Sequence, residues 1–312
     1  MVMMKAVRMY SYGGPEVLVY EDALRPKPGM GEVLIRVYAA AVNSLDGKIR
    51  SGQMQGIFDF QLPLILGSDV AGIVEAVGPD VTTLQVGQEV YGMADRSRSG
   101  SYAEYAIGHR EGLAPKPRTL DYIAAASVPA VAMTAWQALF DKVNLSVGQT
   151  VLVHGAAGGV GIFAVQLAKW KGARVVATAS APTVDMVRDL GADEVIDYKA
   201  TPFEQTVSGV DVVLDILGGD TRERSWGVLK PGGILVSTVP PPPSSAVESR
   251  LRGEMVMVQP NAAQLKEIAG LLDAGEIRTV VERVLPLAQA RQALELNEGG
   301  HTHGKIVLQV VN

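Results

Sequence analysis

The chain has 312 residues, about twice the length of a typical single domain, so two domains are the first expectation. Apolar residues make up 47% of it and charged residues 20%, which is typical of a globular protein and excludes a largely disordered one. The net charge is -5, and the 28 basic side chains form no lysine or arginine run, so no nucleic-acid partner is expected. The absence of cysteine excludes disulfides, thiolate catalysis and cysteine-ligated zinc sites.

The N-terminal residues give an expectation about location. Residues 1–5 lead directly into strand-like sequence, without the apolar stretch and cleavage site of a signal peptide, so we expect a cytoplasmic protein. Residues 123–140 are the most apolar window, but Pro129, Thr134 and Gln137 interrupt it. We therefore expect a buried helix there and no association with a membrane.

The first part of the chain, residues 5–90, has its apolar residues in short runs, such as 33–37, 71–74 and 86–90. Gly-Pro and Pro-Gly pairs separate these runs and indicate turns between strands. This part therefore predicts a mostly β barrel or sandwich.

After Pro129 the pattern changes to strands that alternate with helices, which is typical of a parallel sheet covered by helices on both faces. The proline run at residues 240–245 predicts a loop, because proline cannot donate a backbone hydrogen bond. The C-terminal part predicts two helices and a final strand that return to the first domain. The expected strands are 151–154, 174–178, 194–196, 210–214, 234–238 and 305–310, and the expected helices are 161–171, 184–190, 262–274 and 287–296.

A glycine-rich loop at residues 155–161 joins the first of these strands to the first helix. In this context Gly158, with Gly159 and Val160, lets the backbone approach a pyrophosphate at the helix N-terminus. Gly161 lets the helix pack closely on the strand. Ala156 replaces the first glycine of the usual dinucleotide pattern, and a plain glycine turn is the alternative interpretation.

The end of the second strand distinguishes NAD from NADP, because an acidic residue there would bind the ribose hydroxyl and repel a phosphate. Residues 178–183 read TASAPT, and no carboxylate precedes Asp185. Ser180 can donate a hydrogen bond to a phosphate, although no Arg or Lys stands in the loop. The sequence therefore favours NADP(H).

Eight segments, in order and in register, resemble the quinone oxidoreductase group of the medium-chain dehydrogenase/reductase superfamily. The resemblance implies a GroES-like mostly-β domain at residues 1–128, completed by 260–312, and a doubly wound Rossmann domain with a parallel sheet at residues 129–259. The segments are GGPEVL (13–18), VNSLD with KIRSG (42–46 and 48–52), GSDVAG (67–72), GSYAEY (100–105), TAWQAL (134–139), AAGGVG (156–161), LGADEVIDY (190–198) and GHTHGKIV (300–307).

The resemblance also implies that this chain works without zinc. Zinc-dependent members carry a Cys, a His-Glu pair and a second Cys, whereas Asn43 and Ser68-Asp69 stand at the first two of these places and no cysteine is available for the last. Residues 93–101 pass through the place of the four-cysteine structural lobe. The implied reaction is hydride transfer from NADPH to a quinone or to the activated C=C of an α,β-unsaturated carbonyl compound.

The site residues follow from the same resemblance. Asn43 would lie beside the nicotinamide as the catalytic residue, where its amide could hold a carbonyl or the carboxamide, and a turn-stabilising role is the alternative. Thr134 resembles the threonine that contacts the nicotinamide end, and Tyr198 resembles the tyrosine near the adenosine phosphate, although it could be a packing residue. Lys305 would border the cofactor cleft.

Four further polar residues receive structural interpretations. Asp46 could relay protons, but an N-cap for a helix at residues 47–50 is the favoured interpretation. His154 is expected to be a packing residue at a strand end. His301 and His303 lack the further partners that a metal site needs, so no metal ligand is assigned.

The preferred function is therefore an NADPH-dependent quinone or enone reductase with a small-molecule substrate. The alternative is an NADPH-binding regulatory or interaction protein with weak or no turnover, because no canonical acid is found and Lys48 replaces a tyrosine of some relatives. A zinc alcohol dehydrogenase is nearly eliminated by the lack of cysteine.

A homodimer joined through the Rossmann domains is also expected. Residues 234–239 and the β-prone run 255–258 predict strands that would leave an exposed sheet edge, and an unpaired edge favours aggregation. The superfamily's habit of joining two such sheets across a twofold axis would cover this edge. In the alternative, the loop at 240–245 folds over the edge and leaves a monomer.

Overall fold

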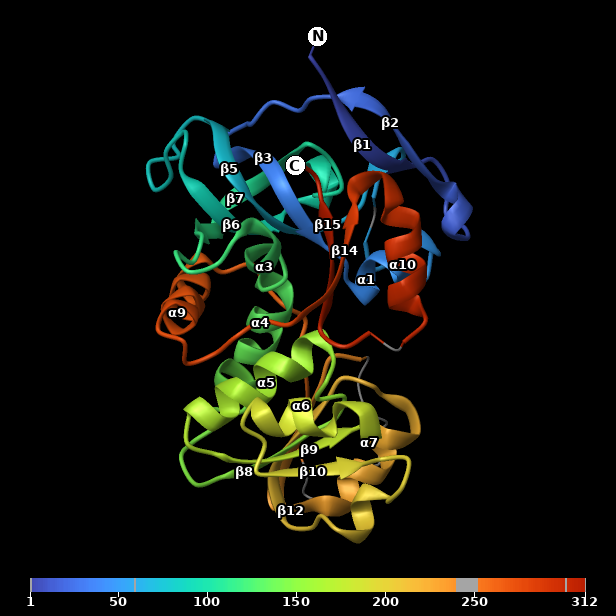
Figure 1. Ribbon diagram of the computed structural model, residues 1–312, viewed down its shortest axis with the longest axis vertical. Helices are drawn as coiled ribbons and strands as arrows, with labels where there is room; N and C mark the ends of the chain where they lie inside the picture. Colours follow the sequence, from blue (N-terminus) through green and yellow to red (C-terminus); the bar gives the residue numbers. More distant parts are fainter. Residues whose placement is uncertain (1, 59, 240–251, 301, 312) are drawn as a thin grey trace. The chain divides into compact units, whose positions relative to one another are not determined.

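The computed structural model describes all residues except 1, 59, 240–251, 301 and 312, and it divides the chain into two compact units (Figure 1). Unit 1 comprises Met1–Ala130, Pro260–Gly275 and Thr279–Asn312, and unit 2 comprises Val131–Gln259 and Glu276–Arg278. Among the described residues, no helix combines the length and the apolar character needed to span a bilayer.

Unit 1 is built from two sheets, as the short apolar runs predict. In the larger sheet β3 pairs with both β5 and β7, so that β3, β5, β6 and β7 close into a barrel. The strands of the smaller sheet, in the order β2-β1-β4, are β2 (Leu18–Leu24), β1 (Met3–Met9) and β4 (Leu64–Ile65). The strands of the larger sheet, in order, are β14 (Val281–Pro286), β15 (Lys305–Gln309), β3 (Glu32–Ala41), β5 (Asp69–Val77), β6 (Glu89–Ala94) and β7 (Tyr105–Pro115).

The C-terminal segment completes unit 1. β15 pairs antiparallel with β3, with Val307 opposite Ala41, and this pairing places the end of the chain beside the barrel. Near it α10 lies against α1 (Figure 1). The helices of unit 1 are α1 (Ser44–Arg50), α2 (Arg96–Ser99), α3 (Tyr122–Ala126), α9 (Ala262–Asp273) and α10 (Ala290–Glu298), with 3-10 turns at Pro15–Val17 and Leu287–Gln289.

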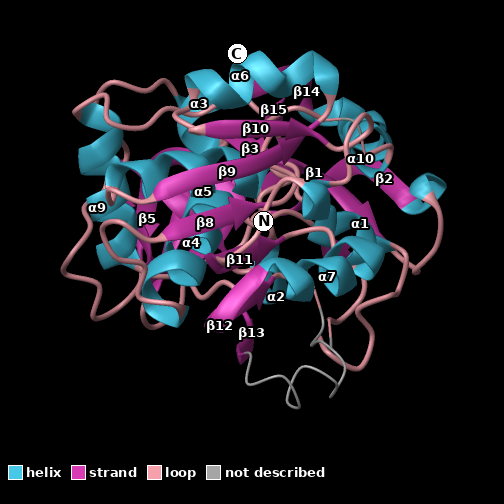
Figure 2. Cartoon of the chain, turned by 90° about the horizontal axis from the view of Figure 1, so that it is seen from below, coloured by secondary structure: helices cyan, strands magenta, loops and turns pink. Residues whose placement is uncertain are grey.

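Unit 2 is a doubly wound Rossmann domain, as predicted. Within its described residues, six strands, all parallel, lie side by side in the order β10-β9-β8-β11-β12-β13 (Figure 2). The central strands β8 and β11 are buried except for Thr150 and Asp211 near their starts, because both faces are covered. The elements are β8 (Thr150–Val153), α5 (Gly159–Trp170), β9 (Arg174–Ala179), α6 (Val184–Asp189), β10 (Glu194–Asp197), β11 (Val210–Asp215), α7 (Gly219–Ser225), β12 (Leu229–Ser237) and β13 (Arg252–Met255), with 3-10 turns at Ala181–Thr183, Phe203–Gln205 and Trp226–Val228.

The apolar window at residues 123–140 is not the single helix that the sequence predicts. It contains α3, then α4 (Pro129–Trp136), then a π-helical turn at Gln137–Lys142. The break falls at Pro129, because proline has no N–H for the preceding turn and its fixed φ favours the first position of a new helix.

The sheet edge also differs from the expectation. The last strand is β13, which ends at Met255, whereas the β-prone run was expected at residues 255–258. Val256 is buried, and its N–H donates to the carbonyl of Ser237 at 2.9 Å. In the described residues β13 has only one strand neighbour, β12. The proline run at residues 240–245 lies outside the described residues.

Candidate cofactor and substrate site

The glycine-rich loop of unit 2 follows β8 and leads directly into α5. Gly155 has a φ of 65°, in the left-handed region that favours glycine. A Cβ on Gly161 would lie 2.3 Å from the carbonyl oxygen of Gly155, so the close approach that this glycine allows is between the helix and the loop after β8, whereas the sequence predicted an approach to the strand itself. Gly158 is the N-cap of α5, and the N–H groups of the first turn, including those of Gly159 and Val160, have no acceptor within the helix. This arrangement fits the pyrophosphate of a dinucleotide.

His154, which directly precedes this loop, fixes its start. It is fully buried at the end of β8, with Nδ1 3.1 Å from Oγ1 of Thr178 and Nε2 2.9 Å from Oγ of Ser225. The Ser225 hydroxyl donates its only hydrogen to the carbonyl of Thr221, so it must accept from Nε2–H of His154. Nδ1 is then an acceptor for the Thr178 hydroxyl. His154 is therefore neutral and connects the end of β8 to β9 and α7 through two hydrogen bonds. Burial lowers its pKa to about 4.

Two of the predicted cofactor residues lie next to each other at the C-terminal ends of the neighbouring strands β9 and β10. Ser180 follows β9 directly and is partly exposed, and Tyr198 follows β10 with its side chain exposed. The N–H of Tyr198 donates to the carbonyl of Ala179, so the two strand ends are adjacent. The nearest carboxylate in the chain after β9 is Asp185, which is paired with Arg188 at 2.7 Å.

Sequence reasoning missed a basic residue near this edge. Lys199 is exposed in the turn after Tyr198, and its N–H donates to Oδ1 of Asp197 at 3.1 Å. The dinucleotide pattern points only to the loop after the second strand, whereas Lys199 lies in the turn after the neighbouring strand β10. Thr134 lies apart from these residues, on α4, where it is nearly buried.

In unit 1 the structure brings Asn43 and Lys305 together, although 262 positions separate them in the sequence. Lys305 begins β15, and its Nζ donates to Oδ1 of Asn43 at 2.7 Å and to the carbonyl of Val42 at 2.5 Å. Asp69 begins β5, and its Oδ2 accepts from Nδ2 of Asn43 at 2.9 Å. Nζ of Lys305 lies 3.8 Å from the same oxygen.

The charged members of this cluster are removed from solvent. The side chains of Lys305 and Asp69 are 5% and 0% exposed. Burial lowers the pKa of Lys305 and raises the pKa of Asp69, and the opposite charge of each partner works against these shifts. Oδ1 of Asp69 also accepts from the N–H of Ala130 at 2.8 Å, which fixes the carboxylate from its other side.

Asp46 is a buried structural partner of Asn43, and the predicted N-cap role for it is wrong. The helix begins earlier than expected, so that Asn43 is the N-cap and Asp46 lies in the first turn. Oδ2 of Asp46 accepts from the N–H of Asn43 and from the hydroxyl of Tyr102, each at 2.9 Å. Nε of Arg96 lies 3.4 Å from the other carboxylate oxygen. These contacts hold the start of α1 in place.

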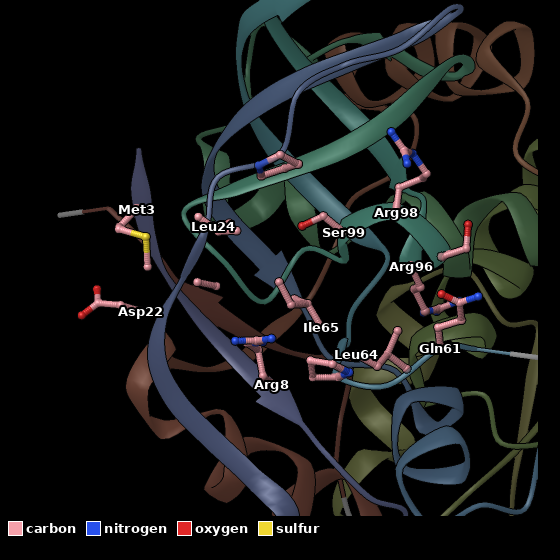
Figure 3. A pocket seen from close by; sticks show the side chains of 14 residues that line it. Met3, Arg8, Asp22, Leu24, Gln61, Leu64, Ile65, Arg96, Arg98 and Ser99 are labelled. Carbon is pink, nitrogen blue, oxygen red and sulfur yellow. The ribbon is translucent and has the colours of Figure 1, made fainter. Parts of the chain in front are cut away.

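A cavity of about 300 Å³ is lined by Arg96 together with Arg98 and Ser99 (Figure 3). The Arg96 guanidinium donates to Oγ of Ser68 at 2.9 Å, and Arg98 is paired with Glu32 at 2.7 Å. These basic groups are therefore already engaged, and none of the predicted site residues lines the cavity.

The residues at the zinc-ligand positions do not fit a zinc ion. Within the described part of the chain there is no group of three or more His, Cys, Asp or Glu side chains that could hold a metal. Asn43 and Asp69 instead contact the ammonium of Lys305, a cation that a metal ion would have to displace.

Comparisons with known proteins agree with this fold. Residues 29–118 match the family described as alcohol dehydrogenase GroES-like domain, and residues 190–308 match the family described as zinc-binding dehydrogenase. The chain is 33% identical to the quinone oxidoreductase of Mus musculus over 328 residues, which cover 98% of each chain. It is 35% identical over 319 residues to the chloroplastic NADPH-dependent alkenal/one oxidoreductase of Arabidopsis thaliana, covering 98% of this chain and 79% of that one.

Among solved structures, the quinone oxidoreductase from Coxiella burnetii is similar with a TM-score of 0.90 and 34% identity, covering 99% of this chain and 100% of that one. The two units have the architecture that such proteins share, and the identity extends over nearly the whole chain. The chain therefore belongs to the quinone oxidoreductase-like family of medium-chain dehydrogenases/reductases.

Proposed function

We propose that this oxidoreductase transfers hydride from NADPH to a quinone or to the activated C=C of an α,β-unsaturated carbonyl compound, and that it does so without zinc. The observation that carries the proposal is the neutral amide of Asn43, held by a buried Lys–Asp pair where a zinc enzyme would carry metal ligands. Relatives named quinone oxidoreductase and NADPH-dependent alkenal/one oxidoreductase support the choice of substrate.

We assign the cofactor to unit 2 and to the C-terminal ends of its strands. Gly159 and Val160 would bind the pyrophosphate through backbone N–H groups that have no acceptor within the helix, and Gly158, whose own N–H donates to the carbonyl of Gly155 at 3.0 Å, would let the backbone approach it. Ser180 and Tyr198 would contact the adenosine phosphate, and Lys199 adds a positive charge on the same edge. When bound, NADPH supplies the hydride.

Thr134 and Lys305 complete the proposed cofactor assignment. Thr134 would contact the nicotinamide end, as the family resemblance implies. Lys305 would act at the border of the cofactor cleft through Asn43, because its ammonium is buried and engaged by Asn43 and Val42.

The protein's own contribution to the reaction is to hold the reacting carbonyl. A hydrogen-bond donor fixed in a partly buried place stabilises negative charge on a carbonyl oxygen better than water does, because it needs no reorganisation. Asn43 is partly buried, and neighbours fix its side chain on both sides. We therefore assign it as the catalytic residue.

Two further parts of the proposal concern the assembly and the location. The outer edge of β13, which has no strand neighbour in the part of the chain that the structure describes, supports a homodimer joined through the Rossmann domains, because a second copy across a twofold axis would pair such an edge. A cytoplasmic location stays a prediction, as does the assignment of residues 1–128 with 260–312 to the catalytic domain and 129–259 to the nucleotide-binding domain.

The decisive experiment is steady-state oxidation of NADPH with a panel of quinones, alkenals, alkenones and simple ketones. We expect turnover with quinones or enones and none with saturated ketones. Tight binding of NADPH without turnover on any member of the panel would favour the alternative, a cofactor-binding regulatory or interaction protein. Turnover of simple alcohols or ketones that is lost on chelation would contradict the zinc-free mechanism.

A further inference from the structure

The carboxamide of Asn43 lies between a buried cation and a buried anion. Its oxygen faces the ammonium of Lys305 at 2.7 Å, and its nitrogen faces the carboxylate of Asp69 at 2.9 Å. These two partners come from the starts of β15 and β5, so the backbone of the barrel sets their positions.

This arrangement allows only one orientation of the amide. If the group turned by half a rotation, its NH₂ would face the NH₃⁺ of Lys305 and its carbonyl would face the carboxylate of Asp69. Both contacts would then be repulsive, since lysine has no acceptor and an ionised carboxylate has no donor. Repulsion between such groups is strong where water is excluded.

The orientation decides what Asn43 can offer to a ligand. One of its two N–H groups is used by Asp69, and the other has no partner among the described residues. Lys305 is poorly placed to donate a hydrogen bond to a ligand itself, because its ammonium already donates to Val42 and Asn43 and its side chain is buried. Asn43 is partly exposed, so its second N–H is the donor that this cluster can present.

We propose that Lys305 and Asp69 are positioning residues that lock the Asn43 amide, so that Asn43 presents an N–H donor to the carbonyl oxygen of the substrate. This inference rests on the proposed function and narrows the substrate to a compound with an acceptor oxygen at the reacting end. Lys305 and Asp69 act through Asn43 and do not touch the substrate.

Asn43→Asp and Asn43→Ala test the donor. Aspartate has nearly the shape of asparagine but has no N–H, so a donor role predicts that kcat/KM falls in Asn43→Asp at least as far as in Asn43→Ala, about 100-fold. If Asn43 acts as an acceptor, Asn43→Asp keeps most of the activity that Asn43→Ala loses. That result would overturn the proposal.

A double-mutant cycle tests the positioning role. We expect Lys305→Met to lower kcat/KM about 10-fold, because the Asn43 amide would no longer be held in line with the carbonyl oxygen of the substrate. The double variant Asn43→Ala/Lys305→Met should match Asn43→Ala alone, because Lys305 has nothing left to position. Fold losses that multiply would show that Lys305 acts independently of Asn43 and would overturn the proposal.

Lys116→Met is the matched control for a lost buried lysine. The Lys116 side chain is 6% exposed, donates to the carbonyls of Pro117 and Leu120, and lies 3.5 Å from Glu89, so it is, like Lys305, a buried lysine near a carboxylate, although the Glu89 side chain is 53% exposed. We expect Lys116→Met to lower the melting temperature as Lys305→Met does while kcat/KM stays near the wild-type value. Equal losses of kcat/KM in the two variants would reduce the role of Lys305 to stability.

A spectroscopic measurement separates this inference from the proposed function. In protein labelled with ¹⁵N in asparagine side chains, the Asn43 resonances are those that disappear in Asn43→Ala. We expect one pair of Nδ2 proton signals, shifted or exchanging faster with solvent in Lys305→Met and unchanged in Lys116→Met. If wild-type protein turns over no quinone or enone, the proposed function fails, whatever the Asn43 signals show. If the Asn43 signals are unchanged in Lys305→Met, the inference is overturned, whatever the enzyme turns over.

Discussion

The buried histidine of unit 2 predicts that this unit loses stability in mild acid. His154 is neutral in the folded state, and its two ring nitrogens are fully used by Thr178 and Ser225. Protonation would place a second N–H against the Thr178 hydroxyl, without solvent to stabilise the charge. The unfolded chain pays no such penalty, so protons bind to it first as the pH falls.

The magnitude follows from the two pKa values. Burial lowers the pKa of His154 from 6.5 to about 4, which corresponds to about 3 kcal/mol of stability at neutral pH. Because the folded-state pKa is the lower one, this stability is complete above pH 6.5 and is lost as the pH falls from 6.5 toward 4. The contribution should fall by about 1.4 kcal/mol per pH unit within that window.

Denaturant unfolding followed by tryptophan fluorescence can measure how the stability of unit 2 depends on pH. All three tryptophans of the chain, Trp136, Trp170 and Trp226, lie in unit 2 together with His154. We expect the free energy of unfolding of wild-type protein to decrease between pH 7 and pH 5, whereas His154→Gln should be less stable at pH 7 and should lack this part of the slope. His109→Gln removes an exposed histidine of unit 1 and is the matched control. An equal slope in wild type and His154→Gln would refute the reasoning.

Four further predictions follow from the site and the fold. NADPH should bind at least about 10-fold more tightly than NADH in a fluorescence titration, and Ser180→Asp should reverse this order, because a carboxylate repels the 2′-phosphate; equal affinities in wild type would contradict the assignment. Purified protein should contain no stoichiometric zinc by elemental analysis, and chelators should leave its activity unchanged; one zinc per chain would refute this. Gly161→Ala should cost about 1 to 3 kcal/mol and weaken NADPH binding, since its Cβ would strike the loop backbone, whereas Gly158→Ala, whose Cβ would meet only one atom, at 3.3 Å, should retain the fold. Light scattering should give the mass of a dimer, twice the 33.0 kDa of one chain, and a monomeric wild type would reject the dimer. Met257→Arg should shift the protein toward monomer; Met257 is chosen because it is half exposed, whereas the neighbouring Val256 is buried and its replacement would disturb the fold itself.

Much of unit 2 could be predicted from the sequence alone. Its first two strands, β8 and β9, are short apolar runs, and each is followed by a helix with apolar residues on one face, so local pattern and final structure agree there. The expected strands at 174–178 and 210–214 each lie within one residue of β9 and β11. The glycine loop was also readable, because Gly161 has to be small wherever a strand leads so directly into a helix.

Local pattern failed where a neighbour in space decides the outcome. The window 123–140 is the most apolar of the chain, but Pro129 divides it into two helices. Pairing with β12 places β13 at Arg252–Met255, ahead of the apolar run at residues 255–258. His154 resembles a packing residue in the sequence, and only the fold brings the hydroxyls of Thr178 and Ser225 to its two nitrogens.

For the candidate site, the sequence determined which residue types are present and which are missing. The absence of cysteine and the amide at position 43 already indicated chemistry without a metal. The tertiary structure alone decided that Lys305 and Asp69, each far from Asn43 in the chain, contact opposite ends of its amide. The physical reason is that strand pairing sets these contacts: β15 lies against β3 and β5 lies against β3, so three distant segments meet where β3 ends and Asn43 begins the next helix.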